Sequence, residues 1–478
     1  MSYQHDDLSV DELLLPITER KGPPPQDLRP EHFAVAQPRD LNLVIRGWKD
    51  DDSEEPLRYT YALLVPGKEA LVADSVLGRQ VRGGAGELRN TWDETAAGDL
   101  PASVYKPANG SPAKPFRLDT QVDLSQVEPS VISRIFQNLV FAGRAAFRTM
   151  FAPHFDHIRM GLLVKELVRL LRERECVMTI WSNQLAAPWA LLCLPDAGDL
   201  ARTRYDTTPE QWGARFWGYR HLIEHRGDEW CESVSAKIQV AQERPLAGAV
   251  VDTGLPQSHR DFLGRLQGLT ELTTCTDAEA FKRLLHADTF DRHVVYICCH
   301  GRVNGSGTAQ FVMRSAEPDM HHFQLSDVYD GIAGGPGDEA ALHALCGRAH
   351  LLGSPLLYLS VCRSGDFTSP GGGSVGEALV GLGASCAVAP EVVLPKELAA
   401  FHAGEFFPAF LSGEVTAGFQ LREIGRELIR RMWNPFGLIY SVKGRFDARL
   451  SYAGVRRVLP GPGRTHPAEG DLTSTEGG

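Results

Sequence analysis

Two apolar stretches of strand length constrain the fold of this chain most, because each ends on a chemically reactive side chain. Residues 293–301 read HVVYICCHG, and residues 356–365 read LLYLSVCRSG. The first stretch delivers His300 and Gly301, and the second delivers Cys362. In an open parallel sheet, the carboxyl ends of the strands line the crevice where ligands bind and chemistry takes place. The two stretches therefore predict a His300/Cys362 pair at one edge of a sheet.

The segments around these stretches alternate between strand and helix patterns, which predicts an α/β fold with a mainly parallel sheet. Helical periodicity begins near residue 123, and a second helix is expected over about 161–174. Further strands are expected at 176–183, 246–252, 271–275, 386–393 and 435–444. Further helices are expected at 258–268, 277–287, 374–384, 397–411 and 414–431.

Composition and periodicity divide the chain into four parts. Residues 1–40 are polar and proline-rich, which predicts a flexible leader, and residues 459–478 read as a disordered tail. Residues 41–122 start with a hairpin pattern and are expected to form a small β-rich N-terminal module. Residues 123–458 form the main domain, with an N-terminal part at 123–244 and a catalytic part at 245–458.

Charge and cysteine usage exclude several classes of protein. The formal net charge is −11 and no dense Lys/Arg stripe offsets it, which argues against a nucleic-acid binder. The nine cysteines are an odd number with no CxxC pair and no secretory leader, so reduced thiols and a cytoplasmic location are expected. No window of about eighteen residues is uninterrupted by polar groups, so no membrane contact is expected.

The predicted pair has the chemistry of nucleophilic catalysis. A cysteine nucleophile needs a nearby base, and an imidazole takes the thiol proton and later donates one to the departing amine. The backbone amides of Gly301 and Cys362 are expected to hold an oxyanion. Glycine at position 301 lets the backbone approach a substrate carbonyl.

Three other interpretations compete with catalysis. A cysteine at the end of an apolar strand is usually a small buried hydrophobe. A metal cluster from Cys298, Cys299, His300, His321 and His322 is disfavoured, because neighbouring residues in a strand point to opposite faces. The glycine-rich segment 370–378 lacks the Lys-Ser/Thr of a phosphate loop. No metal and no cofactor are therefore expected.

A series of short motifs runs through residues 125–450. The chain has His300-Gly301, the strand LSVC at 359–362 with Gly365, and the helix VGEALVGLGAS at 375–385. It also has Phe406-Phe407, the turn Leu411-Ser412-Gly413 and the upstream segment TIWSNQLAAPWALL. In this order the motifs resemble those of the CHAT family of caspase-like cysteine peptidases. The tetratricopeptide repeats that often accompany the domain are absent.

The resemblance implies a caspase-like three-layer fold and assigns roles to single residues. By this resemblance His300 is the histidine of a dyad, Cys362 is the nucleophile, and the amides of Gly301 and Cys362 form the oxyanion hole. Arg363-Ser364 replaces the family's usual acidic-polar pair, and the segment 389–397 has no tryptophan. These departures leave four residues as candidates for the substrate groove: Arg363, Ser364, Glu391 and Glu397.

The function expected from the residues and the resemblance together is a caspase-like cysteine endopeptidase acting on a protein substrate. The family implies regulation by a protein partner in a signalling or prokaryotic conflict system. The alternative is a catalytically silent scaffold of the same fold that binds a partner. A flavodoxin-like small-molecule binder is disfavoured, because no phosphate-cradling loop follows the strand at 246–252.

Overall fold

The structure is a computed structural model of the chain, and the part of it that can be described has several gaps. It describes residues 39–48, 58–101, 104, 116–152, 157–182, 185, 187–195, 208–227, 235–252, 254, 256–276, 280, 284, 291–303, 309–314, 320–324, 351, 353–362, 364, 375–381 and 383–453. The predicted leader (except its last two residues), the tail and most of the helix expected at 277–287 lie outside these residues.

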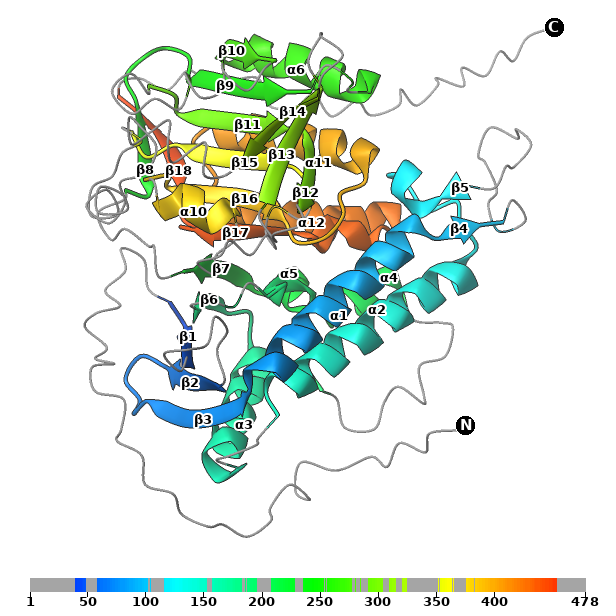
Figure 1. The fold of residues 1–478 in the computed structure, drawn as a ribbon, viewed down its shortest axis with the longest axis vertical. Coiled ribbons are helices and arrows are strands. Elements are labelled where there is room, and N and C mark those ends of the chain that lie inside the picture. Colours follow the sequence, from blue (N-terminus) through cyan, green and yellow to red (C-terminus); the bar gives the residue numbers. More distant parts are fainter. Residues whose placement is uncertain are drawn as a thin grey trace, which may run out of the picture.

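One long sheet organises the described residues, and its strands follow the order β10-β9-β11-β15-β16-β17-β7-β6-β1-β2-β3 (Figure 1). The strands are β1 (Leu41–Trp48), β2 (Arg58–Leu64), β3 (Leu71–Leu77), β6 (Val177–Ser182), β7 (Leu222–Arg226), β9 (Leu246–Val251), β10 (Glu271–Cys275), β11 (Val294–Cys298), β15 (Leu356–Ser360), β16 (Cys386–Pro390) and β17 (Tyr440–Gly444). Neighbouring strands pair in parallel except at β16–β17, β1–β2 and β2–β3. The predicted α/β class with a mainly parallel sheet is therefore confirmed.

The described helices are α1 (Gly78–Ala97), α2 (Pro129–Met150), α3 (His157–Glu173), α4 (Pro209–Gly213), α5 (Trp217–Arg220), α6 (Gln257–Leu269), α10 (Val375–Gly381), α11 (Lys396–Leu411) and α12 (Ala417–Met432). Short 3₁₀ turns are η4 (Leu118–Thr120), η5 (Trp189–Leu191) and η8 (Pro435–Leu438). Three small sheets complete the description: β12–β13–β14 (His300–Val303, Ala309–Arg314, Met320–Gln324), β8 with β18 (Lys237–Val240, Arg449–Tyr452), and β4 with β5 (Asp99–Leu100, Phe116–Arg117).

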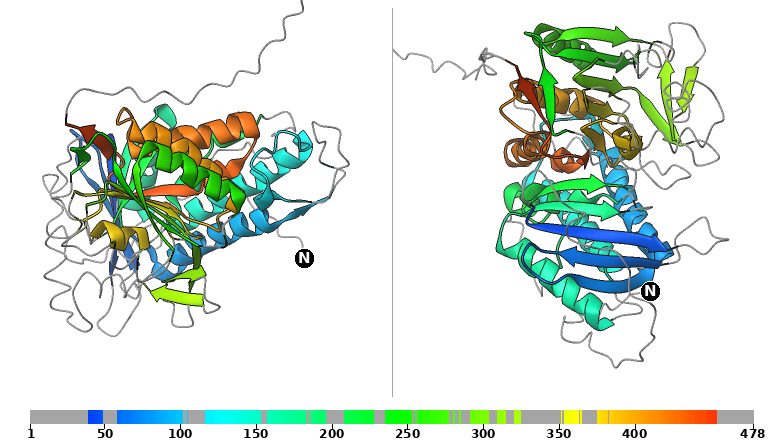
Figure 2. Two further views of the ribbon diagram at one scale, coloured as in Figure 1. Left: turned by 90° about the horizontal axis from the view of Figure 1, so that it is seen from above. Right: turned by 90° about the vertical axis from the view of Figure 1, so that its left-hand side faces the viewer.

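Helices cover both faces of the sheet at β15 and β16 (Figure 2). On one face, the ring of Tyr358 packs on Phe406 and Phe407 of α11, with ring centroids 5.0 and 5.2 Å apart. On the other face, Gly376 of α10 lies against Ala387 of β16. Ala387 and its neighbour Val388 point to opposite faces of the sheet. Val388 is the register partner of Tyr358, so α10 and α11 lie on opposite faces. This part of the chain therefore has three layers, and its central strands are apolar along their whole length because both faces are buried.

The N-terminal segment differs from its prediction. A small β-rich module is expected over 41–122, but β1 pairs in parallel with β6, so its strands extend the long sheet. The 20-residue helix α1 was not predicted, because its glycines have low helix propensity. An apolar stripe on α1 packs against α2, and the absence of a side chain at Gly84 allows the close approach to Thr149. Tertiary packing of that stripe outweighs propensity here.

The closing segment 435–444 is only partly a strand. Pro435 begins the 3₁₀ turn η8, where the Asn434 side chain accepts a hydrogen bond from the amide of Phe436. Strand β17 begins at Tyr440 and runs antiparallel to β16. Its other edge pairs in parallel with β7. Strand β17 thereby joins the N-terminal and C-terminal halves into one sheet.

Two buried histidines predict that the protein loses stability in acid. Burial, with help from neighbouring arginines, lowers the pKa of His221 to about 3, and burial lowers the pKa of His402 to about 3. Both values lie below the ordinary histidine value of 6.5. The unfolded chain therefore takes up protons first, so the free energy of unfolding falls as pH drops from about 6.5 towards 3. Each histidine contributes about 1.4 kcal/mol per pH unit in that window.

The measurement is urea unfolding between pH 7 and pH 4. In His402→Gln the slope of the unfolding free energy against pH is expected to decrease by about 1.4 kcal/mol per pH unit, the contribution of one histidine. The control is His157→Gln, at an exposed position of α3, which should leave the slope unchanged. Equal slopes in wild type and His402→Gln would contradict the prediction.

Candidate active site

Three neighbouring strands end at the candidate site, in the order β9, β11, β15. The parallel register pairs Cys298 with Ser360 on one side and with Val251 on the other. His300 and Cys362 each follow this register row by 2 residues, so they lie at matching positions beyond adjacent strand ends. The structure thus brings the two predicted residues to the same end of the same two strands, and their catalytic pairing stays a prediction.

The strands that carry the two residues are rigid, and the segments beyond them are not part of the long sheet. Every residue of β11 and β15 is buried, which fixes both strand ends. After Cys298 the chain leaves the sheet, and His300 begins β12, which pairs with β13 in a separate antiparallel sheet. The side chain of His300 is 44% exposed. His300 is therefore a partly exposed side chain that directly follows a buried strand.

The surroundings of the Cys362 thiol favour its protonated form. Its Sγ donates to the backbone carbonyl of Leu394, 3.9 Å away. Burial raises the pKa of Cys362 and the negative charge of Asp93 raises it further, whereas a backbone hydrogen bond at Leu394 and the charge of Lys396 oppose the increase. Because the thiolate is the reactive form of cysteine, a base or a rearrangement is needed before this side chain can attack a substrate.

Asp252 is a member of the site that sequence reasoning missed. It is the first residue after β9 and is 3% exposed. Its Oδ1 accepts from the amide of Gly254 at 2.8 Å, and its Oδ2 lies 3.6 Å from Nε2 of His300. The available signal was its position: it ends the strand pattern LAGAVVD, at the same edge as His300 and Cys362.

Helix α1 reaches the site from the N-terminal half of the chain. Arg89 donates to the backbone carbonyl and the carboxylate of Glu391, at 3.1 and 3.0 Å. One helical turn later, Asp93 accepts from the amide of Val393 at 2.6 Å. The next residue, Leu394, contacts the Cys362 thiol. Two side chains of α1 therefore hold the 391–394 loop against the candidate nucleophile.

Glu391 is a buried carboxylate that forms two ion pairs. It is fully buried, and its carboxylate pairs with Arg89 at 3.0 Å and with Lys443 at 2.8 Å. Burial alone would raise the pKa of Glu391, but the charges of Lys443 and Arg89 outweigh burial and lower the pKa. A carboxylate held by two cations joins α1 to the sheet, and a role of Glu391 in the substrate groove stays a prediction.

The other residues predicted for the groove and the oxyanion hole fall into different environments. Ser364 is fully buried, Glu397 is half-buried in the first turn of α11, and Arg363 lies outside the described residues. Gly301 pairs with Phe311 of β13, next to His300. The oxyanion-hole role of Gly301 and Cys362 stays a prediction. Val393, which sequence reasoning did not single out, is 38% exposed in the 391–394 loop.

A second cysteine–histidine contact lies in the core. Sγ of Cys298 is 3.5 Å from Nδ1 of His259, and both residues are buried. His259 also contacts the Tyr296 hydroxyl at 3.2 Å and the Lys396 carbonyl at 3.0 Å. Burial raises the pKa of Cys298 to about 12. This thiol stays protonated at neutral pH and has no access to a macromolecular substrate.

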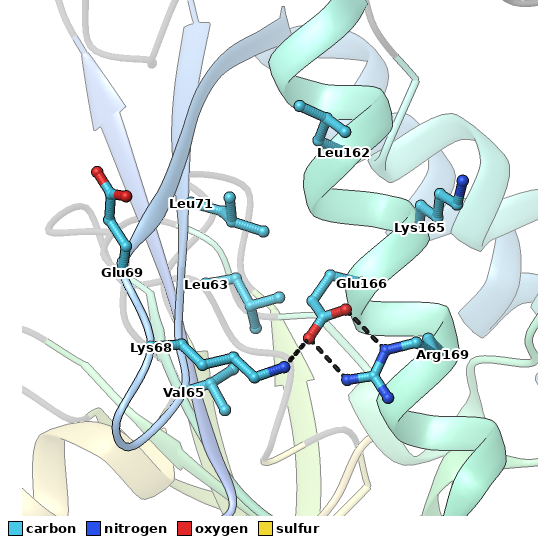
Figure 3. Close-up of a pocket in the computed structure, with 9 residues that line it drawn as sticks. All are labelled: Leu63, Val65, Lys68, Glu69, Leu71, Leu162, Lys165, Glu166 and Arg169. Carbon is cyan, nitrogen blue, oxygen red and sulfur yellow. Dashed lines mark hydrogen bonds and ion pairs between the residues drawn. The ribbon is translucent and has the colours of Figure 1, made fainter.

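A cleft of about 400 Å³ lies elsewhere, between the β2–β3 hairpin and α3 (Figure 3). Leu63, Leu71 and Leu162 form part of its apolar wall. At its rim Glu166 is bound by Lys68 and Arg169, at 2.7 and 2.8 Å, so these three charged groups are paired with one another. The lining contains no nucleophile or imidazole and supports no catalytic role.

None of the described helices is long and apolar enough to cross a membrane. Within the same residues, no group of three or more His, Cys, Asp or Glu side chains is arranged to hold a metal ion.

Comparison with known proteins gives one curated relative. No protein-family model matches the chain. A probable protease of Vitiosangium sp. (strain GDMCC 1.1324) is 23% identical over 236 residues, which cover 47% of this chain and 28% of that relative. The chain therefore spans less than a third of the relative it matches.

Solved structures that resemble this chain include two crystal structures of the Saccharomyces cerevisiae separase–securin complex, at 2.6 and 3.0 Å resolution. The sequence identity is 8% in both cases, and the TM-scores are 0.40 and 0.38. The matches cover 86% and 84% of this chain and 30% of the matched chain.

Proposed function

We propose that the protein is a caspase-like cysteine endopeptidase that cleaves a protein substrate through Cys362 and His300. The observation that carries the proposal is the matched position of these two residues beyond the ends of β11 and β15. The similarity to a probable protease and the CHAT-like order of motifs support the same activity.

In the proposed reaction, Sγ of Cys362 attacks the carbonyl carbon of the scissile peptide bond, and His300 takes the thiol proton. The amides of Gly301 and Cys362 donate to the oxyanion. His300 returns the proton to the leaving amine as the C–N bond breaks, which leaves a thioester on Cys362. Water, deprotonated by His300, then hydrolyses the thioester and restores the thiol.

The contacts of the Cys362 thiol support a regulated enzyme. In the described state the thiol is neutral and donates to the Leu394 carbonyl, so the nucleophile is held in an unreactive form. The 391–394 loop that holds it is bound in turn by Arg89 and Asp93 of α1. A protein partner that shifts α1 would release the loop and the thiol together, as expected of a signalling or prokaryotic conflict system.

The test is terminus labelling of a proteome, with wild type compared with Cys362→Ala and with candidate protein partners added. New protein termini that depend on Cys362 support the endopeptidase. The half-buried thiol with its raised pKa is the observation that favours the alternative, a catalytically silent scaffold. That alternative predicts no cysteine-dependent termini under any condition, together with partner binding that survives Cys362→Ala.

The contact of α1 with the 391–394 loop leads to a separate prediction. Asp93→Asn removes a negative charge that raises the Cys362 pKa and weakens the acceptor for the Val393 amide. The Cys362 pKa is therefore expected to fall, with a severalfold faster alkylation by iodoacetamide at pH 7 and a higher basal cleavage rate. The measurement is the pH dependence of alkylation at Cys362, quantified by peptide mass spectrometry.

The matched control is Glu94→Gln, which removes the same charge from the next, exposed position of α1. Its alkylation profile should follow that of wild type. An Asp93→Asn profile that also matches wild type would show that α1 does not control the thiol.

A further inference from the structure

We infer that Asp252 is a positioning residue for His300. Its carboxylate accepts a hydrogen bond from Nε2–H of His300, and this contact turns Nδ1 of the ring towards Cys362. The inference rests on the proposed function and adds a third residue to the dyad. Strand order supplies the arrangement, because β11 lies between β9 and β15. Asp252 and Cys362 therefore flank His300 on opposite sides, one from each neighbouring strand end.

Asp252 is fixed more firmly than a surface carboxylate. Its backbone amide donates to the carbonyl of Cys298 at 2.9 Å, which continues the β9–β11 ladder by one residue. Its Oδ1 accepts from the amide of Gly254 at 2.8 Å, which closes a tight turn. The first hydrogen bond fixes the backbone and the second restrains the buried carboxylate, which suits a side chain that orients a ring.

Among the residues that the structure describes, the second carboxylate oxygen of Asp252 lacks a hydrogen-bond donor, which favours a histidine beside it. Oδ2 of Asp252 is buried and accepts no hydrogen bond within the described part of the chain. A buried carboxylate oxygen without a donor costs free energy, and a nearby cation offsets that cost. Nε2 of His300 lies 3.6 Å away, slightly beyond hydrogen-bonding distance, and a small rotation of the half-exposed ring would close the gap.

The geometry determines the proton location that catalysis needs. When Nε2 carries its proton towards Asp252, Nδ1 has a free lone pair and acts as the base for the Cys362 thiol. The carboxylate also stabilises the imidazolium that forms when Cys362 loses its proton. The charge of Asp252 reaches this neighbourhood, because it contributes to the raised pKa of the Cys298 thiol.

The test compares Asp252→Asn with wild type. The amide keeps an oxygen for the Gly254 amide, so the turn is preserved, but it presents no negative charge to Nε2. We expect kcat for a Cys362-dependent substrate to fall roughly 10²- to 10⁴-fold with KM unchanged. We also expect the His300 pKa to fall, followed by NMR of histidine-labelled protein, because the imidazolium loses its stabilising charge.

Two controls separate this inference from the proposed function. Asp261→Asn, an exposed position of α6, removes one carboxylate without touching the site and should leave both readouts unchanged. In a His300→Ala background, Asp252→Asn should cause no further loss of Cys362 alkylation, because Asp252 acts through the ring. If Asp252→Asn does not fold, Asp252→Ser keeps a short acceptor for Gly254 and takes its place.

The NMR titration decides the inference even if the protein cleaves nothing. A His300 titration that is the same in wild type and in Asp252→Asn would overturn the positioning role. If the His300 pKa falls in Asp252→Asn but no Cys362-dependent cleavage is found, the result would support the Asp252–His300 contact and overturn the peptidase. Activity of Asp252→Asn equal to wild type would also overturn the inference.

Discussion

Replacing Cys362 with alanine is expected to abolish substrate cleavage while the protein stays folded. The side chain is small and half-buried, and its described hydrogen bond goes to the single carbonyl of Leu394. Loss of a catalytic nucleophile lowers kcat by roughly 10⁴- to 10⁶-fold in enzymes where the nucleophile and base act as a unit. His300→Ala should cause a loss of similar size, and the double variant should be no worse than either single one.

The chain supplies a matched control in Cys298→Ala. Cys298 lies on the neighbouring strand and contacts a histidine, but it is buried with a pKa of about 12. Its removal should cost some stability and leave the rate constants of the folded enzyme within a few-fold of wild type. Retained cleavage in Cys362→Ala, or equal losses in the two variants, would assign the activity to another residue.

Replacing Glu391 with glutamine is expected to destabilise the fold strongly. The amide leaves the buried cations Arg89 and Lys443 without their shared carboxylate. Removing one partner of a buried ion pair typically costs about 3–5 kcal/mol, because the remaining charge is left uncompensated in the interior. The measurement is the free energy of unfolding in urea at pH 7, with substrate kinetics on the folded fraction.

Glu397→Gln is the matched control, since Glu397 was proposed for the same groove and is only half-buried. Its unfolding free energy should change by less than about 0.5 kcal/mol, as is usual for positions near the surface. A Glu391→Gln variant that is as stable as wild type but prefers a different residue at the cleavage site would contradict the structural role and restore the groove role.

The C-terminal part of the fold was predictable because its strands carry strong local signals. Strands β9, β11 and β15 are apolar throughout, with turns and amphipathic helices between them, and the structure places each within a residue or two of its prediction. A sheet covered on both faces requires such runs. The positions of His300 and Cys362 at the strand ends follow from parallel pairing of those runs.

The N-terminal half was less predictable because its helix α1 is determined by a distant surface. Residues 78–97 contain several glycines and read as weak structure in isolation. Packing of Val81, Leu88 and Trp92 against the rest of the core stabilises the helix. The contact of Arg89 with Glu391 joins residues 302 positions apart, and no local pattern indicates it.

The α/β class, most strand and helix positions, and the two reactive side chains at neighbouring strand ends could be predicted from local patterns. These features follow from periodicity over short windows, where the physical signal is local burial. Three other features were visible only in the folded chain: Asp252 lies beside His300, Glu391 is buried between two cations, and α1 holds the loop at Cys362. Each of these depends on strand order or on contacts between distant segments, which local patterning does not encode.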